Sequence, residues 1–336
     1  MYSRISGTRT MVAVLMIVMM LVGCSSVFAA SGRSQVAYVS CYPIDSAEWL
    51  QALVAGLKEY AKKDNFEIKI VEASNSNEYE PKIQALAESG YYDLIITSYD
   101  FHAPATISVA KKFPKQKFAI LDAGIRNIEE HQNIQEFKLD RLETAYLAGC
   151  VAGLISETEK VGMVGGADMG VINEIIAGWQ QGLRKTNPNV VDLVVYANSF
   201  SDPAKGKELG LSLAGKGCDI IASAAGGTGI GAAQAAAEVG SPFVAWDVHY
   251  PDVLHGLELG SAVNHFEVMF RHYINSVCAG DYHPGTVRVY GIAENACDFE
   301  FPADSPVPES VRIELEEIRQ EILDGEITIS PDLLHK

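Results

Sequence analysis

The sequence predicts an α/β protein of two Rossmann-like lobes, each built around a parallel β-sheet. From Gln35 onward, short apolar runs alternate with longer amphipathic stretches. Such alternation is typical of right-handed βαβ units, whose strands form a parallel sheet. The alternation begins again after about residue 140, which indicates two similar lobes instead of one long sheet.

The first lobe is predicted from buried strands and from helices with one apolar face. In the first helix, for example, Leu50, Leu53 and Leu57 recur at helical spacing, so one face is core. The predicted strands are 36–41, 67–71, 94–97 and 117–122, and the predicted helices are 47–63, 80–89 and 105–113.

The second lobe repeats this order, and the tail departs from it. The predicted strands are 160–164, 193–196, a run after Asp219 and 242–246, and the predicted helices are 143–156, 171–185, 204–216 and 231–239. In the tail, helices are predicted at 266–279 and 308–324 and short strands at 287–291 and near Leu257. We therefore expect the chain to cross between the lobes more than twice. The expected division is 35–138 plus about 263–284 for lobe 1, and about 139–262 plus 285–330 for lobe 2.

The N-terminus predicts export. Arg4 and Arg9 precede an apolar run of about a dozen residues, which is short for a membrane span and suits a secretory signal. The run ends in LVGC at 21–24, which resembles the lipobox of bacterial lipoproteins. That resemblance implies cleavage of a signal peptide, 1–23, and acylation of Cys24. Residues 24–34 are small and polar, as a flexible tether should be. An ordinary signal peptide or an uncleaved anchor is the alternative.

The net charge of the chain limits the kinds of molecule that it can bind. The sequence has 26 basic and 43 acidic side chains, for a net charge of −17. Residues 1–23 contain two arginines and no acidic residue, so the remainder is near −19. Such a charge argues against nucleic acid and anionic lipid surfaces as partners.

Five cysteines follow Cys24, and they are widely spaced without a C-x-x-C pair. This number and spacing fit neither a disulfide framework nor a zinc site. Cys41, Cys150 and Cys218 lie beside apolar runs, so we expect them to be small core residues. One or two bridges among the five remain open.

A glycine-rich turn joins the strand after Asp219 to the following helix. Gly227, Gly229 and Ala232 match the G-x-G-x-x-G/A dinucleotide fingerprint, and Asp247 follows about 20 residues later. That fingerprint normally opens a domain at its first strand, whereas this one comes late in the chain. Nicotinamide cofactors are also not expected outside the cytoplasm, so we expect no cofactor. Backbone N–H groups at a helix N-terminus can instead hold a polar ligand.

Catalytic patterns are scarce. The chain has no Gly-x-Ser-x-Gly elbow, His-Glu-x-x-His pair or Walker loop. His249 and His255 are a weak signal for a metal, and we expect none. Asp202, Glu143 and Asp122 could pair as acid and base, but carboxylates at strand ends serve equally well as ligand acceptors. We therefore expect a binding protein and not an enzyme.

Ligands of open parallel sheets bind beyond the carboxyl ends of the strands. Two lobes with facing strand ends would form a hinged cleft there. Aromatic side chains near these ends could stack on a flat ring, and carboxylates could accept from its hydroxyl or N–H groups. The aromatic candidates are Trp49, Phe101, Phe200 and Trp246, each of which could equally be core, and the carboxylate candidates are Asp45, Asp122 and Asp247.

Five segments in order resemble the basic membrane protein family of bacterial substrate-binding lipoproteins, which includes purine-nucleoside receptors of ABC importers. They are 143–149 (ETAYLAG), 160–166 (KVGMVGG), 199–207 (SFSDPAKGK), 226–229 (GGTG) and the tail 307–327. The resemblance covers nearly the whole chain after the leader. It implies the type I periplasmic-binding-protein fold, with three crossovers between the lobes, and an ABC permease and ATPase as partners.

The resemblance also implies roles for particular residues. Phe200 matches the ring-stacking aromatic of the second lobe, and Gly226, Gly227 and Thr228 match a loop that lines the cleft. Asp247 matches an aspartate that takes ribose hydroxyls, and Trp49 can inherit the stacking role of the first lobe.

Two departures concern the ligand. The asparagine that would bind the base is replaced by Leu50, and the family's sugar-binding lysine falls near Asn264. The predicted ligand is a purine nucleoside or a related purine, and a free nucleobase or another flat heterocycle is the competing prediction. A secreted nucleoside-processing enzyme, with Asp202 or Asp247 as base, and a ligand-sensing signalling receptor are further alternatives.

Overall fold

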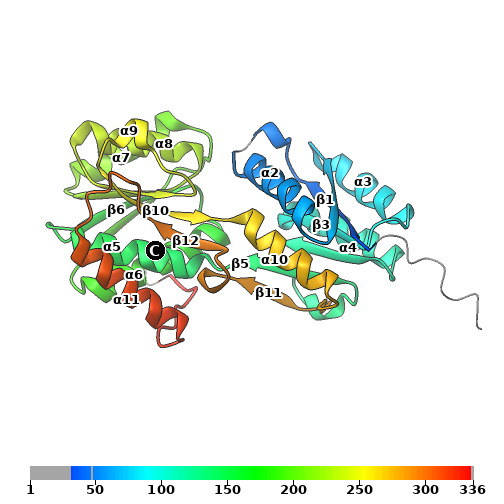
Figure 1. Cartoon of the computed structure of the whole chain (residues 1–336). Coiled ribbons are helices and arrows are strands. Elements are labelled where there is room, and N and C mark those ends of the chain that lie inside the picture. The colour runs from blue at the N-terminus through cyan, green and yellow to red at the C-terminus, as the bar shows by residue number, and fades with distance from the viewer. Residues whose placement is uncertain (1–31, 47, 334–336) are drawn as a thin grey trace, which may run out of the picture.

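The structure is a computed structural model that describes residues 32–46 and 48–333. Two α/β lobes lie side by side, each with a six-stranded sheet between layers of helices (Figure 1). The predicted fold class is confirmed. The signal peptide, Cys24 and most of the tether fall outside the described residues.

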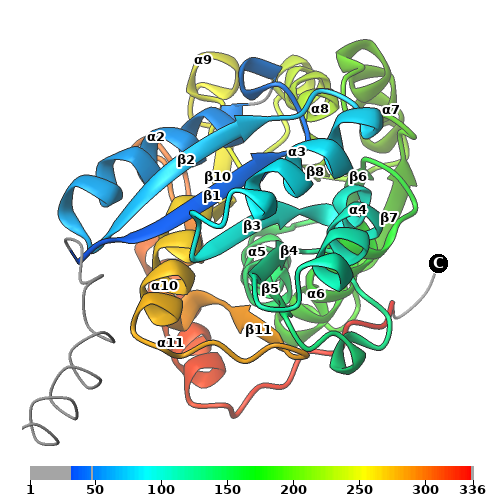
Figure 2. The same cartoon turned by 90° about the vertical axis from the view of Figure 1, so that its right-hand side faces the viewer.

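The sheet of lobe 1 has the order β11-β5-β4-β3-β1-β2, and all of its neighbouring strands pair in parallel. Helices α2 and α10 cover one face and α3 and α4 cover the other (Figure 2). The bounds are β1 Ser34–Ser40, β2 Phe66–Glu72, β3 Leu94–Ser98, β4 Lys117–Leu121, β5 Ile134–Leu139, β11 Val287–Tyr290, α2 Glu48–Lys63, α3 Ser76–Glu88, α4 Tyr99–Lys112, α10 Phe266–Cys278, and the 3-10 helices η1 Ile44–Ser46 and η2 Ile128–Glu130.

Lobe 2 repeats this topology with the order β12-β10-β9-β8-β6-β7, in which only β12 pairs antiparallel. Helices α5, α6 and α11 cover one face and α7, α8 and α9 the other. The bounds are β6 Lys160–Gly165, β7 Val191–Tyr196, β8 Ile220–Ala224, β9 Phe243–Trp246, β10 Glu258–Asn264, β12 Cys297–Glu300, α5 Arg141–Ile155, α6 Gly170–Thr186, α7 Pro203–Gly215, α8 Gly227–Val239, α9 Pro251–Leu254, α11 Glu309–Leu323 and the 3-10 helix η3 Ile292–Glu294.

Strand β1 shows why these runs form central strands. Val36 and Tyr38 point to the face covered by α2 and α10, whereas Ala37 and Val39 point to the opposite face. Side chains alternate along a strand, so a strand covered on both faces must be apolar at every position. The continuous apolar runs of the sequence therefore become buried parallel strands.

The chain passes between the lobes three times, after β5, after β10 and after β11. Two hydrogen bonds join the crossing segments: Asp140 N–H donates to the Tyr290 carbonyl at 2.7 Å, and His265 N–H donates to the Ala296 carbonyl at 2.8 Å. The Glu143 carboxylate accepts from the Ile292 N–H at 2.9 Å. The crossing segments therefore form one hydrogen-bonded junction between the lobes.

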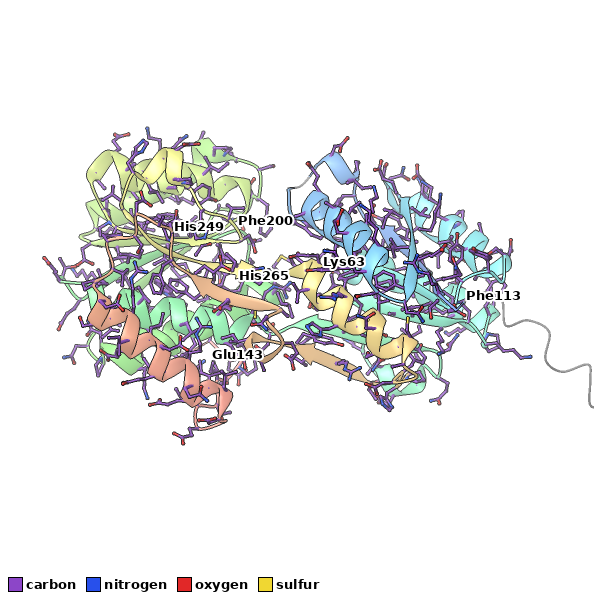
Figure 3. All side chains as sticks on the ribbon, viewed as in Figure 1. Lys63, Phe113, Glu143, Phe200, His249 and His265 are labelled. Carbon is purple, nitrogen blue, oxygen red and sulfur yellow. The ribbon has the colours of Figure 1, made fainter. Side chains whose placement is uncertain are left out.

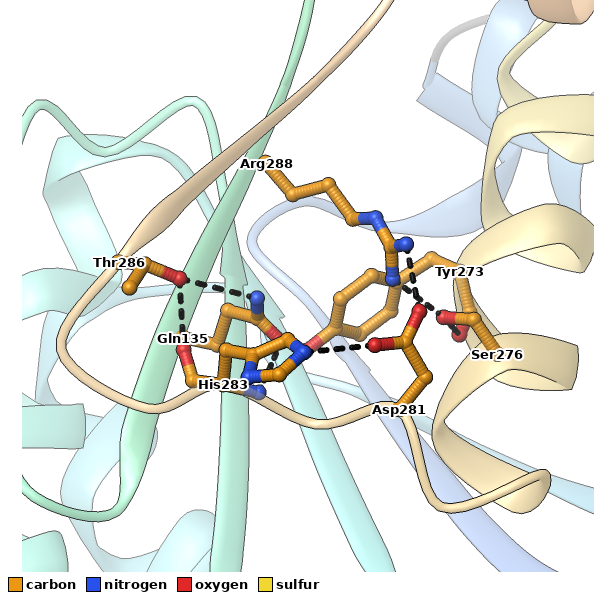
Figure 4. Close-up of polar contacts among 7 residues, drawn as sticks. All are labelled: Gln135, Tyr273, Ser276, Asp281, His283, Thr286 and Arg288. Atoms are coloured by element: carbon orange, nitrogen blue, oxygen red, sulfur yellow. Dashed lines mark hydrogen bonds and ion pairs between the residues drawn. The ribbon is translucent and has the colours of Figure 1, made fainter.

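Strand β11 differs from the expected division, which places 285–330 in lobe 2, because β11 pairs with β5 in lobe 1. The loop before β11 is held to α10 by Arg288, which donates to Asp281 at 2.6 Å and to Ser276 at 2.8 Å (Figure 4). Gln135 of β5 donates to Thr286 at 3.1 Å. Contacts between residues far apart in sequence therefore determine that β11 belongs to lobe 1, and a local sequence pattern cannot predict them.

Two strands, β5 and β12, were not predicted. In β5, Gln135, Glu136 and Lys138 interrupt the apolar pattern, although Gln135 and Glu136 are buried. Glu136 is satisfied inside the protein, since its carboxylate accepts from the backbone N–H groups of Gly124 and Ile125 at 2.8 and 3.0 Å. A strand that contains buried polar residues with hydrogen-bond partners lacks the continuous apolar pattern by which buried strands are predicted.

The five described cysteines are free thiols, and Cys41, Cys150 and Cys218 are buried as expected. A search of the helices in the described ranges finds none long and apolar enough to cross a membrane.

Candidate ligand-binding site between the lobes

Three residues directly after strands adopt left-handed backbone conformations. Tyr99 follows β3, Asp122 follows β4 and Asp247 follows β9, with φ values of 65°, 47° and 65°. Left-handed conformations are uncommon for residues with a side chain and cluster at functional sites. All three lie at the carboxyl ends of parallel strands, two in lobe 1 and one in lobe 2.

Arg141 connects the two lobes. Asp140 caps the N-terminus of α5 by accepting from the Leu142 N–H at 3.0 Å, which makes Arg141 the first helical residue. Its Nη2 donates to Asp122 Oδ2 at 2.7 Å, and the side chains are only 7% and 5% exposed. Burial works against the charge of Arg141, but Asp122 outweighs it, so the pKa of the guanidinium is raised. A buried pair thus joins the end of β4 to the start of α5.

Asp247 is the second carboxylate at this point. Burial raises its pKa, whereas the nearby Arg141 and a hydrogen bond from Asn264 Nδ2 oppose that shift. Asp247 is nevertheless accessible to water. The Asp247 carboxylate is therefore partly desolvated by the surrounding protein but still open to solvent, as a group that binds a ligand must be.

Aromatic rings surround the Arg141 pair. The Trp49 ring contacts Tyr99 edge-on at 5.9 Å and Phe266 at 5.2 Å between centroids. Phe266 in turn lies 5.9 Å from the Arg141 guanidinium carbon. Trp49 is half-buried, so part of its surface remains available. Trp246 lies in the core of lobe 2, 6% exposed.

Lobe 1 presents a second, more exposed aromatic pair. Phe101 is 49% exposed and Tyr42 40% exposed, and their ring centroids are 5.9 Å apart. Asp45, in η1, is also exposed. This exposed aromatic pair lies near the carboxyl ends of β1 and β3, where a ligand of the sheet could contact it.

Phe200 is the exposed ring of lobe 2, and Figure 3 shows it on the side that faces lobe 1. It is 43% exposed. Its inner side rests on Gly166, where an added Cβ would lie 2.0 Å from the ring. Gly226 adopts φ 53° below the Phe200 carbonyl, which a Cβ there would approach to 3.2 Å. Two glycines therefore make room for the Phe200 loop.

Thr228 holds that loop in place. It is fully buried, its Oγ1 accepts from the Asp202 N–H at 2.9 Å, and it donates to the Ser199 carbonyl at 3.1 Å. Gly227 also lies close to the Phe200 carbonyl, since a Cβ added at Gly227 would lie 3.3 Å from the carbonyl oxygen. The structure thus gives Thr228 a supporting position beneath Phe200, with its hydroxyl already engaged on both sides.

The predicted site residues fall into two groups. Asp122, Asp247, Asn264 and Trp49 gather around Arg141, while Phe200 with 226–228 and the exposed residues of lobe 1 lie further along the strand ends. Sequence reasoning missed Arg141, Tyr99, Phe266 and Gly166. An arginine at the start of an apolar helix carries no local signal, because its partner Asp122 is 19 residues away.

The carboxylates considered for catalysis have structural partners. Asp202 caps α7 by accepting from the Lys205 N–H at 3.0 Å, and Glu143 binds the third crossover. The Nδ1 of His249 faces Glu258 at 2.5 Å. Within residues 32–46 and 48–333, no three His, Cys, Asp or Glu side chains are grouped to hold a metal.

Two Rossmann-like lobes joined by three crossovers define the type I periplasmic-binding-protein fold, in which ligands bind at the facing strand ends. The sequence profile of the family described as "ABC transporter substrate-binding protein PnrA-like" matches residues 34–332. The chain belongs to this family, known as Bmp. Its role implies a small-molecule ligand and a permease with its ATPase as partners.

Two curated relatives are similar to the chain over more than half of its length. The chain is 28% identical over 307 residues to a "CD4+ T-cell-stimulating antigen" of Listeria monocytogenes, covering 85% of each chain. It is also 28% identical over 192 residues to the "ABC transporter nucleoside-binding protein BmpA" of Lactococcus lactis, covering 56% of this chain and 54% of the relative.

Solved structures share the fold at lower identity. A solute-binding protein of an ABC transporter system from Conexibacter woesei superposes with a TM-score of 0.71 at 22% identity, covering 89% of this chain and 99% of the other. A transcriptional activator of the comK gene from Bacillus halodurans gives a TM-score of 0.74 at 18% identity, covering 88% and 99%. At these identities the likeness concerns the fold alone.

Proposed function

We propose that this protein is a lipid-anchored receptor that binds a purine nucleoside or a related purine between its lobes and delivers it to an ABC permease. The observation that carries the proposal is the exposed ring of Phe200, seated on Gly166 and turned toward lobe 1 (Figure 3). An exposed ring at one set of strand ends, with hydrogen-bonding carboxylates at others, suits a flat heterocycle that carries polar groups. The nucleoside-binding name of the Lactococcus lactis relative supports the same ligand class.

A free nucleobase or another flat heterocycle is the second candidate, and two departures from the family pattern argue against an intact nucleoside. Leu50 stands where the family's base-reading asparagine is expected, and it is fully buried in the core. Asn264, near the place of the sugar-binding lysine, donates to Asp247. The carboxylate expected to bind ribose hydroxyls thus already has a neighbouring partner.

A binding panel tests this function. Isothermal titration of the purified chain with inosine, guanosine, adenosine and the corresponding bases should give saturable one-site binding, and bound ligand should raise the melting temperature. Tight binding of a sugar or an amino acid, with no response to any purine, would disprove the ligand class. Release of free base from a nucleoside during the titration would point to the nucleoside-processing alternative.

The anchor is proposed from Cys24, which lies ten residues before the start of β1 at Ser34. Cys24→Ser should abolish metabolic labelling with a radioactive fatty acid and move the protein from the membrane to the soluble fraction. Unchanged labelling and fractionation of the variant would disprove lipidation at Cys24.

A further inference from the structure

Arg141, a donor, and Asp247, an acceptor, are held at the interlobe site by one short segment, because Phe266 lies beside Arg141 and Asn264 donates to Asp247. We propose that this pair reads the edge of a ring on which a carbonyl stands next to an N–H, so that the ligand is a 6-oxopurine and not a 6-aminopurine. This inference rests on the proposed function and sharpens its substrate class. Arg141 would be the specificity-determining residue.

The geometry fixes the guanidinium as a donor in one orientation. Asp122 takes Nη2 at 2.7 Å, Phe266 lies beside the guanidinium carbon at 5.9 Å, and both members of the ion pair are nearly fully buried. A guanidinium is planar, remains protonated and carries five N–H groups. Because the pair with Asp122 uses Nη2, the groups on Nε and Nη1 remain for an acceptor such as a ring carbonyl.

Asp247 supplies the matching acceptor, in place of the ribose-binding role that the family resemblance implies for it. Asn264 donates to its Oδ1, which orients the carboxylate and leaves Oδ2 for a second donor. The left-handed backbone at φ 65° turns this residue out of β9 at the edge of the sheet. Phe266, which contacts Arg141, follows Asn264 by two residues, so the arginine and the carboxylate are held by one short segment.

The chemistry of the two purine classes is opposite at this edge. A 6-oxopurine presents an acceptor, O6, beside a donor, N1–H, which complements an arginine beside a carboxylate. A 6-aminopurine presents an amino group to the arginine and a lone pair to the carboxylate, so both contacts become repulsive. A site built for one hydrogen-bonding pattern rejects a ligand that leaves its buried polar groups unpaired.

The charge of the cluster points the same way. Arg141 neutralises Asp122, and Asp247 adds one further negative charge. The cluster is therefore unsuited to an anionic ligand such as a nucleotide phosphate, and it suits a neutral base or nucleoside.

The test is competitive titration of the full-length chain, purified in detergent, with hypoxanthine, guanine and adenine, and with inosine, guanosine and adenosine. We expect the dissociation constant of each 6-oxo compound to be lower than that of its 6-amino counterpart by about 100-fold or more. The bases and the nucleosides form separate arms, which identify the natural form of the ligand.

Two variants locate the selectivity. Asp122→Asn combined with Arg141→Gln replaces the ion pair by a neutral amide pair, and it should reduce the preference to within about tenfold. Asp247→Asn keeps the shape and tolerates the left-handed backbone, but it adds an N–H donor, so it should raise the relative affinity for adenine. The matched control is Asp64→Asn with Arg271→Gln, which alters the Arg271–Asp64 pair of lobe 1, at 2.6 and 3.0 Å.

The outcomes separate the inference from the proposed function. If purines bind without 6-oxo preference, or the folded site variants keep the wild-type preference, the inference is wrong and the receptor function stands. If no purine binds but uracil does, with loss in the Arg141 variant, the carbonyl-reading role stands and the purine function fails. If no ring with a carbonyl next to an N–H binds, the inference is overturned.

Discussion

Phe200 is an aromatic side chain that the fold holds partly open to solvent. Glycines at 166 and 226 lie under it, and Thr228 fastens the loop on either side of it. A ring exposed to 43% contributes little to the core, and we propose that its exposed face contacts the ligand. The sequence predicts a loop that lines the ligand site at Gly226, Gly227 and Thr228. In the structure these three residues support the Phe200 loop from below.

Phe200→Ala should therefore weaken purine binding without unfolding the protein. Stacking of a base on an aromatic ring is worth about 1–3 kcal/mol, which raises the dissociation constant about 5- to 150-fold. Isothermal titration measures the change. Tyr91→Ala, at a ring 59% exposed on lobe 1, is the control and should leave affinity unchanged. Equal affinities of wild type and Phe200→Ala would show that Phe200 does not contact the ligand.

His102 makes the stability of lobe 1 depend on pH. It is fully buried, its Nδ1 accepts from the Ser98 N–H at 3.1 Å, and burial lowers its pKa to about 4. The unfolded chain, with an ordinary histidine pKa near 6.5, binds more protons than the folded chain between these values. Stability is therefore complete above about pH 6.5 and falls as the pH drops toward 4.

Urea denaturation at pH 7 and pH 4.5 should show this loss, on the order of 2–3 kcal/mol from His102. His102→Asn keeps an acceptor and cannot gain a proton, so its stability should fall less over the same interval. His255→Asn, at an exposed histidine, is the control and should behave as wild type. An identical pH dependence of His102→Asn and wild type would contradict the assignment.

At the scale of elements, glycines bring helices into backbone contact. In the α5–α6 pair, a Cβ on Gly182 would lie 1.9 Å from the Tyr146 carbonyl oxygen, and one on Gly149 would lie 2.2 Å from that of Trp179. In the α7–α8 pair, a Cβ on Gly231 would lie 1.7 Å from the Pro203 carbonyl oxygen. Gly231, which follows the glycine-rich turn, therefore allows α7 and α8 to pack closely.

Gly182→Ala should force α5 and α6 apart and destabilise lobe 2 by about 1–3 kcal/mol or more, because backbone atoms cannot rotate out of the way. Thermal unfolding followed by circular dichroism measures the loss. Gly170→Ala, in the first turn of α6 with open space around it, should change stability by less than about 1 kcal/mol. Equal melting temperatures of the two variants would show that α6 can shift freely.

At the scale of the molecule, the lobes are joined by a junction of three crossing segments and by the Arg141–Asp122 pair beside it. Phe200 and Phe101 lie on opposite lobes and keep exposed rings. A ligand that contacts both lobes would favour the closed arrangement through its differential affinity for it.

Saturating ligand should therefore reduce the radius of gyration measured by small-angle X-ray scattering. At a ligand concentration that just saturates wild type, Phe200→Ala should show a smaller decrease, since fewer molecules are occupied. Superimposable scattering curves with and without ligand, at proven saturation, would show that binding does not close the lobes.

The sequence by itself determined the fold class, most helices and strands, and the family. Continuous apolar runs such as that of β1 must be covered on both faces, and their alternation with amphipathic helices leaves few topologies. It also predicted that Asp122 and Asp247 follow strands, because the position of a residue along the chain is local information.

The tertiary structure decided which residues meet. Strand β11 joins lobe 1 through contacts with residues far away in sequence, and Arg141 meets Asp122 across the lobes. The charge on Asp247, the support under Phe200 and the packing role of Gly231 all depend on neighbours from other elements. Hydropathy records whether a residue prefers burial, but burial beside a particular partner is settled only when the chain has folded.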